Sequence, residues 1–97
     1  MTNYTDYLKK RMETEAEWGL FCCYEEITLK KARQLRKCGF EVTDSKDSNK
    51  SPRRHRIAWK DAVVQCADVH ALNPASYAYT WPQKLWITAM QNRKLLD

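Results

Sequence analysis

The stretch from Ile27 to Trp59 constrains the fold more than any other part of the chain, because a helix there must end just before a strand begins. Thr28 is suited to cap the start of this helix. Gly39 follows its last turn, where a residue able to adopt a left-handed conformation commonly ends a helix. Residues 40–43 and 55–59 then alternate apolar and polar side chains, as half-buried strands do. This order predicts a helix followed directly by a β-hairpin.

The two strands of this hairpin can be paired so that one face is wholly apolar. The pairing puts four side chains on that buried face: Phe40, Val42, Ile57 and Trp59. On the other face we expect Glu41 to meet Arg56. The connection, residues 45–54, is almost wholly polar and longer than the about 2–5 residues of ordinary hairpin loops. A loop of this kind is either disordered or functional, and the sequence leaves both open.

Upstream of this stretch, the sequence predicts a helix and a short strand. Residues 3–18 repeat apolar side chains at helical spacing, and Gly19 is placed to stop that helix. Residues 20–24 form a short continuous apolar run. Its length, its aromatic residues and the preceding glycine favour a buried strand over a helical turn.

Downstream, the sequence predicts one or two further helices. Residues 61–70 have apolar side chains nearly all round a helix, with a strand over residues 62–66 as the alternative. Residues 80–83 carry a capping-box signature, with Thr80 at the cap and a proline in the first turn. The last helix then runs to about Lys94, with a stripe of inward side chains: Leu85, Trp86, Ala89 and Met90.

These elements fit one small domain of the α+β class, residues 1–97. Their order is helix, short strand, helix, β-hairpin and one or two C-terminal helices. A chain of 97 residues has room for a single domain that hides roughly two-thirds of its unfolded surface. Its apolar content of 43%, with four tryptophans, is sufficient for a core.

The net charge of +5 favours phosphate-rich partners or an acidic protein surface, and it argues against mimicry of DNA. Basic residues gather on the central helix and around the hairpin tip. Arginine and lysine bind phosphates by releasing counterions. The pattern therefore predicts contact with nucleic acid or a nucleoprotein complex, without sequence-specific readout. The expected contact residues are Lys30, Arg33, Lys37, Lys50, Arg53, Arg54 and Arg56. A merely solvated helix face and polar loop is an alternative of equal weight.

In local outline, residues 27–59 resemble the recognition helix and wing of winged-helix domains. The resemblance implies a cationic tip that can enter a groove of nucleic acid. It is confined to this stretch and to its shape. The sequence departs from the pattern because no clear pair of helices joined by a short turn precedes the hairpin, as helix-turn-helix docking requires.

No catalytic or metal-binding motif is present in the sequence. There is no Gly-rich phosphate loop, no Gly-x-Ser-x-Gly elbow and no carboxylate–histidine motif at helical spacing. The four cysteines and two histidines lack the spacings of zinc sites. We therefore expect a protein that is not an enzyme and uses neither a cofactor nor a metal.

A role from another class is also compatible with the chain. By analogy of size alone, it suits a phage- or mobile-element-encoded inhibitor, such as an anti-CRISPR protein, that blocks a host nuclease complex by protein–protein contact. Such an interface would use Tyr77 and Tyr79 together with the amphipathic first helix and the hairpin. An exposed stripe on that helix could equally seal a homodimer.

The sequence lacks signals for membrane insertion or export. No run of about 18 apolar residues occurs, and the N-terminus does not have the basic-then-apolar layout of a signal peptide. We therefore expect a cytoplasmic protein with its cysteines as free thiols.

Overall fold

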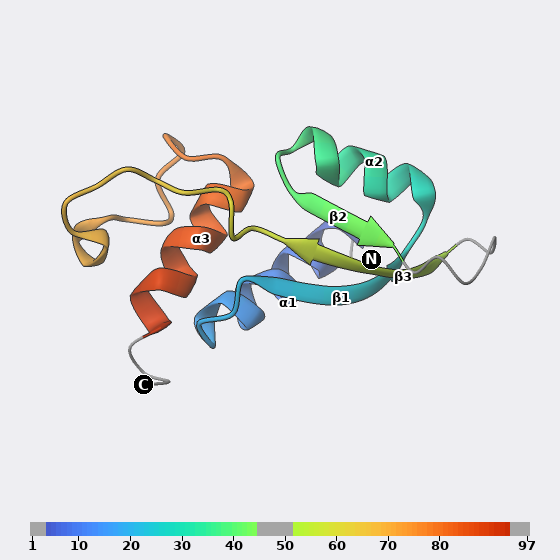
Figure 1. Cartoon of the computed structure of the whole chain (residues 1–97), viewed down its shortest axis with the longest axis horizontal. Helices are drawn as coiled ribbons and strands as arrows, with labels where there is room; N and C mark the ends of the chain where they lie inside the picture. The colour runs from blue at the N-terminus through green and yellow to red at the C-terminus, as the bar shows by residue number, and fades with distance from the viewer. Residues whose placement is uncertain (1–3, 45–51, 94–97) are drawn as a thin grey trace.

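A computed structural model describes residues 4–44 and 52–93 as a mixed α+β fold. A 3₁₀ turn, η1 (Val69–Ala71), precedes the last helix. The elements lie in the order α1 (Tyr4–Glu17), β1 (Cys22–Ile27), α2 (Leu29–Lys37), β2 (Glu41–Asp44), β3 (Arg53–Ala58), η1 and α3 (Trp81–Asn92), as Figure 1 shows. None of the helices in the described parts of the chain is long and apolar enough to cross a membrane.

The predicted end of α2 is confirmed in detail. Gly39 has a φ of +106°, and Gly19 likewise has a positive φ of +79° after α1. The N–H of Phe40 donates to the carbonyl of Leu35 at 3.1 Å. This is the hydrogen bond of a Schellman ending, in which a glycine turns the chain out of the helix. The chain can therefore enter β2 directly after α2.

The predicted N-caps of α2 and α3 are also confirmed. The hydroxyl of Thr28 accepts from the N–H of Lys31 at 3.1 Å. At α3, Thr80 and Gln83 form a reciprocal capping box, with hydrogen bonds of 2.9 and 3.4 Å. Each cap satisfies backbone donors that have no partner within the helix.

The three strands form an antiparallel sheet in the order β1-β3-β2, so β3 is the central strand. The predicted β2–β3 hairpin is confirmed, with Val42 opposite Ile57 on the buried face. Arg56 lies opposite Thr43, so the expected cross-strand pair of Glu41 with Arg56 is wrong. In the observed register Glu41 lies opposite Ala58, which is two residues beyond Arg56 in β3.

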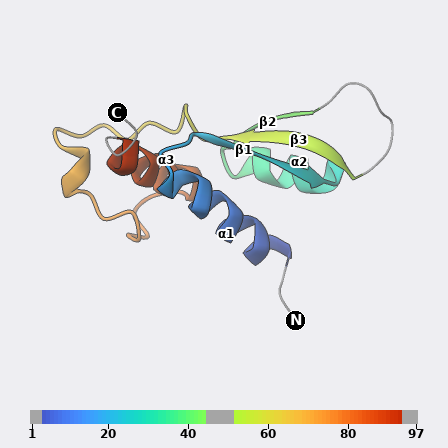
Figure 2. The ribbon, with the colours of Figure 1, turned by 90° about the horizontal axis from the view of Figure 1, so that it is seen from below.

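Both α1 and α2 lie on the same side of the sheet, as Figure 2 shows, and α3 packs beside α1. Buried apolar side chains from all three helices and all three strands form one core. Those from the helices are Leu8, Met12, Ala16, Ala32, Leu35, Leu85, Trp86, Ile87 and Ala89. Leu8, Met12 and Ala16 of the apolar stripe of α1 are therefore covered by the chain itself, whereas Tyr4 and Tyr7 of the same stripe are exposed. A homodimer sealed by this stripe stays a prediction.

The predicted strand over residues 20–24 is displaced. β1 begins at Cys22 and continues through Glu25 to Ile27, paired along its whole length with β3. Charged residues can lie within this strand because α1 supplies a partner: Arg11 Nε donates to Glu25 at 2.6 Å. The continuous apolar run over residues 20–24 therefore indicated only the first part of this strand.

Residues 61–68 are neither the helix nor the strand that the sequence predicts. They run irregularly to the short turn η1, where the Asp68 side chain accepts from the backbone of His70 at 3.0 Å. The amide of Gln91 on α3 donates to the carbonyls of Val69 at 2.9 Å and Leu72 at 2.7 Å. A side chain from α3 thus satisfies backbone carbonyls at and after η1, directly beyond the irregular segment.

Candidate functional site

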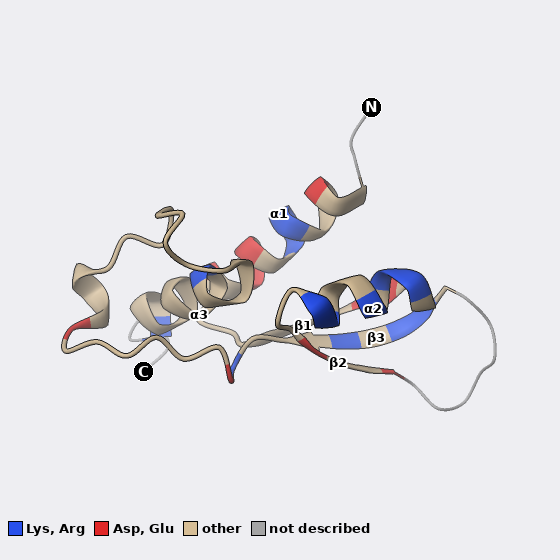
Figure 3. Ribbon diagram, turned by 90° about the horizontal axis from the view of Figure 1, so that it is seen from above, with Lys and Arg blue, Asp and Glu red and all other residues tan. Residues whose placement is uncertain are grey.

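Positive charge is concentrated in one half of the molecule. Residues 28–59 contain ten lysines and arginines and three acidic residues, whereas the rest of the chain contains seven basic and nine acidic residues. Figure 3 shows the basic residues gathered on α2 and β3, while α1 also carries several acidic ones. Such an asymmetry attracts an anionic partner to the half formed by α2, β2 and β3.

The outward side of α2 carries a row of free cations. Ala32 and Leu35 are buried against the sheet, so positions on the far side of the helix point to solvent. Three exposed cations lie there, none of them ion-paired with a described acidic residue: Lys30, Arg33 and Lys37. We call this set the α2 ridge. At 1.5 Å per residue it spans about 10 Å, a length over which duplex DNA presents about six phosphate charges.

The other two cations of α2 are held by the protein itself. The guanidinium of Arg36 donates to the backbone carbonyl of Val42 in β2. The ammonium of Lys31 donates to the Thr5 hydroxyl of α1 at 2.6 Å. These two side chains tie the helix to its neighbours, which leaves the α2 ridge on a well-supported helix.

On β3 the basic side chains alternate between the two faces of the sheet. Arg54 and Arg56 lie on the face opposite the helices, and Arg53 lies on the helix side in an ion pair with Asp44. His55, which the sequence groups with the cationic tip, is only 1% exposed. Its Nδ1 lies 2.7 Å from the carbonyl oxygen of Arg53. It is therefore a buried side chain of the sheet.

The predicted contact residues thus do not form one positive ridge. Three of them form the α2 ridge. Arg54 and Arg56 lie on the opposite face of the sheet, and Arg53 lies on the helix side in its ion pair with Asp44. Lys50 lies outside the described residues. The cause is the period of two in a strand, which sends neighbouring side chains to opposite faces. The predicted hairpin already implied this division, because an inward Ile57 requires an outward Arg56.

Tyr24 joins the two outward arginines, and the sequence analysis did not single it out. It lies opposite Arg56 in the register, and the Arg54 guanidinium is 4.9 Å from the centre of its ring. We call the side chains of Tyr24, Thr43, Arg54 and Arg56 the open-face cluster. Only the pairing of β1 with β3, which are far apart in the sequence, brings the cluster together.

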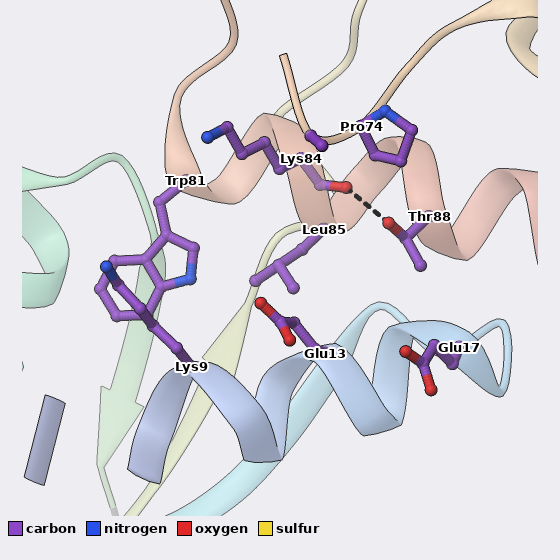
Figure 4. A pocket seen from close by; sticks show the side chains of 9 residues that line it. Lys9, Glu13, Glu17, Pro74, Trp81, Lys84, Leu85 and Thr88 are labelled. Atoms are coloured by element: carbon purple, nitrogen blue, oxygen red, sulfur yellow. Dashed lines mark hydrogen bonds between the residues drawn. The ribbon is translucent and has the colours of Figure 1, made fainter. Parts of the chain in front are cut away.

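A hollow of about 460 Å³ lies between α1, α3 and the loop at Pro74 (Figure 4). Lys9 extends from α1 to Trp81, with its Nζ 5.4 Å from the ring centre. Lys84 and two glutamates of α1, Glu13 and Glu17, also line it. These opposite charges balance, so the hollow lacks the charge bias of the α2 ridge.

Within residues 4–44 and 52–93, no three His, Cys, Asp or Glu side chains lie close enough together to hold a metal ion. All four cysteines are free thiols; Cys23 is buried, while Cys38 and Cys66 are exposed. Burial raises the pKa of the Cys23 thiol to about 12, which makes it a poor nucleophile.

Comparisons of the chain with family models, with curated proteins and with solved structures found no match. The function is therefore inferred from the geometry of this molecule alone.

Proposed function

We propose that the protein is a non-catalytic nucleic-acid-binding protein that holds phosphates on the α2 ridge. The observation that carries the proposal is the row of three exposed cations, Lys30, Arg33 and Lys37, with no acidic partner among the described residues. The target is free nucleic acid or nucleic acid within a nucleoprotein complex.

The α2 ridge is suited to bind phosphate for two reasons: its cations are not held in ion pairs with described residues, and the helix that carries them is fixed at both ends. A cation already held in an ion pair would have to break that pair before binding a phosphate. The helix beneath the ridge is fixed by the Thr28 cap at one end and the Gly39 turn at the other. Phosphate contacts of this kind give an affinity that depends steeply on salt and little on sequence.

The test is a salt titration of binding to a fluorescently labelled duplex of about 16 base pairs. The variant changes all three residues of the ridge to glutamine: Lys30→Gln, Arg33→Gln and Lys37→Gln. We expect the parent protein to bind at low salt. We expect the slope of log K against log salt to fall by about 2 to 3 in the variant, because each lost phosphate contact removes about 0.9.

A matched control removes the same charge elsewhere. Lys10→Gln, Lys60→Gln and Lys84→Gln lie outside the basic half and lower the net charge equally. The proposal requires this control to keep most of the parent's affinity and slope. It is wrong if the parent does not bind at low salt, or if the two triple variants lose affinity to the same extent.

A second candidate function is the inhibitor of a host nuclease complex, which acts by protein–protein contact. Two large exposed aromatic side chains favour it: Tyr77 is 98% exposed and Trp18 is 64% exposed. Exposed aromatics of this kind are frequent at the centre of protein interfaces. Substitution of both by alanine would abolish capture of a host protein under this reading and leave oligonucleotide binding unchanged.

We also propose that the protein is located in the cytosol. The four free cysteines support it, because exposed thiols persist in a reducing compartment.

A further inference from the structure

The face of the sheet that α1 and α2 leave uncovered has a row of side chains unlike the charged ridge on α2. Tyr24 of β1, Arg56 of β3 and Thr43 of β2 stand opposite one another across the three strands. The row therefore offers, side by side, an aromatic ring, a guanidinium and a hydroxyl. Arg54 precedes Arg56 by two residues on the same face of β3, and its guanidinium lies over the Tyr24 ring.

Tyr24 is not part of the core. The residue is 50% exposed, and the guanidinium of Arg54 stacks 4.9 Å from its ring centre. A tyrosine ring and an arginine plane are the two surfaces on which proteins stack unpaired bases. The pair is held together before any ligand arrives, which lowers the entropy lost on binding.

The cluster surrounds a hollow of about 320 Å³, which Asp44 and His55 also line. This volume lies at the lower end of the range of about 300–1,000 Å³ for ligand pockets. The hollow therefore has the size for a small planar group rather than for a protein segment.

The open face also carries two exposed glutamates, Glu26 and Glu41, so the position of Arg56, and not the charge of the whole face, favours a phosphate beside that group. Neither Arg54 nor Arg56 is ion-paired with a described acidic residue. Glu26 stands opposite Arg54, whereas Arg56 has the uncharged Thr43 and Tyr24 on its two sides. Arg56 is thus the cation best placed to meet a phosphate.

We infer that the open-face cluster binds an unpaired nucleotide of a single-stranded nucleic acid. The base stacks on the Tyr24–Arg54 pair, and its phosphate is bound by Arg56. A base within a duplex cannot reach this surface, because both of its faces are already stacked on neighbouring bases. The inference rests on the proposed function and adds to it a preference for single strands on one side of the sheet.

The test compares two variants of Tyr24. Tyr24→Leu keeps the apolar bulk without the ring, and Tyr24→Phe keeps the ring. The probes are labelled oligo-dT and oligo-U of about 12 nucleotides, together with the duplex used for the α2 ridge. We expect Tyr24→Leu to weaken binding of the single strands by about tenfold or more and to leave the duplex unchanged. Tyr24→Phe should bind as the parent does.

The single-stranded probes separate the sources of the nucleotide. Oligo-dU is added as a third probe, because it has the base of oligo-U and the sugar of oligo-dT. Tighter binding of oligo-U than of oligo-dU identifies RNA as the ligand, and the reverse identifies DNA. Either result supports the inference. A second readout is photocrosslinking, in which an oligonucleotide containing 5-iodouracil should form its adduct on the peptide that contains Tyr24.

Failure of this inference differs from failure of the proposed function. If the duplex binds and the single strands do not, or if Tyr24→Leu binds single strands as tightly as the parent, the open-face cluster is not a nucleotide site and the α2 ridge remains. If Tyr24→Leu weakens duplex binding equally, the inference is also wrong. If no probe binds, both proposals are wrong.

Discussion

The guanidinium of Arg36 donates two hydrogen bonds to the carbonyl oxygen of Val42, at 3.1 Å from Nε and 2.8 Å from Nη2. Val42 belongs to β2, an edge strand of the sheet. Exposed edge strands present unpaired backbone groups that invite pairing with another chain. Arg36 therefore binds a backbone carbonyl of this edge strand.

This contact predicts different effects for two arginines of the same helix. Arg36→Ala should lower the free energy of unfolding by about 1 kcal/mol relative to Arg33→Ala, because it removes charge-assisted hydrogen bonds to the sheet. Helix propensity changes equally in both variants, so Arg33→Ala is the matched control. Arg33→Ala should weaken oligonucleotide binding more. Urea denaturation followed by tryptophan fluorescence measures the first effect, and equal midpoints would contradict it.

The ion pair between α1 and β1 predicts a non-additive pair of substitutions. Glu25 accepts from Arg11 at 2.6 Å, its side chain is only 14% exposed, and this hydrogen bond raises the pKa of Arg11. Arg11→Met should destabilise the protein by about 1–3 kcal/mol, because it leaves a mostly buried carboxylate without its partner. Adding Glu25→Gln should recover part of that loss. A double-mutant cycle in urea checks this, and a double variant no more stable than Arg11→Met would count against it.

The buried thiol of Cys23 predicts a loss of stability in alkaline solution. Burial raises its pKa from 9.0 to about 12, so the folded chain keeps the proton where the unfolded chain releases it. The stabilising effect is complete below pH 9 and is lost as the pH rises from 9 to 12, by at most about 1.4 kcal/mol per pH unit. Cys23→Ala should flatten this decline.

The raised pKa of Tyr4 acts in the same direction and remains in that variant, so the difference between the two curves isolates the thiol. Thermal unfolding across this pH range provides the measurement. Parallel curves for the parent and Cys23→Ala would refute the assignment. Alkylation at pH 8 should modify the exposed Cys38 and Cys66 and spare Cys23.

A side chain at Gly39, in the turn after α2, should make too close a contact with Pro82 of α3, and a smaller residue at position 82 should relieve it. Gly39 has a φ of +106°, and a Cβ at this position would lie 3.2 Å from Cγ of Pro82 in α3. Gly39→Ala should therefore destabilise the protein by more than about 1–2 kcal/mol, the cost of the backbone conformation alone. Combining it with Pro82→Ala removes the close contact, so the two changes should cost less than their sum. Strict additivity in a denaturation series would rule out the steric part.

The features that the sequence predicted correctly are those with local signals. The Thr28 cap, the Gly39 turn and the capping box at Thr80 each depend on residues within one helical turn. The hairpin was predictable as well, because two alternating strands have one register that buries all their apolar side chains. The α+β class follows from these elements.

The features that it missed depend on distant contacts. The segment 61–68 has apolar residues without a clear period, and Gln91 of α3 supplies hydrogen bonds beside it. Tyr24 became a candidate only when β1 paired with β3. The division of the cations has another cause: counting charges along residues 30–56 ignores the direction in which each side chain points.

The central position of β3 has a consequence for synthesis on the ribosome. β1 and β2 each pair with β3 and not with one another. A nascent chain that has emerged only as far as β2 therefore has two strands and no ladder to join them. The sheet can assemble only after the arginine-bearing strand leaves the exit tunnel, so the open-face cluster, which draws its side chains from all three strands, becomes complete only in that step.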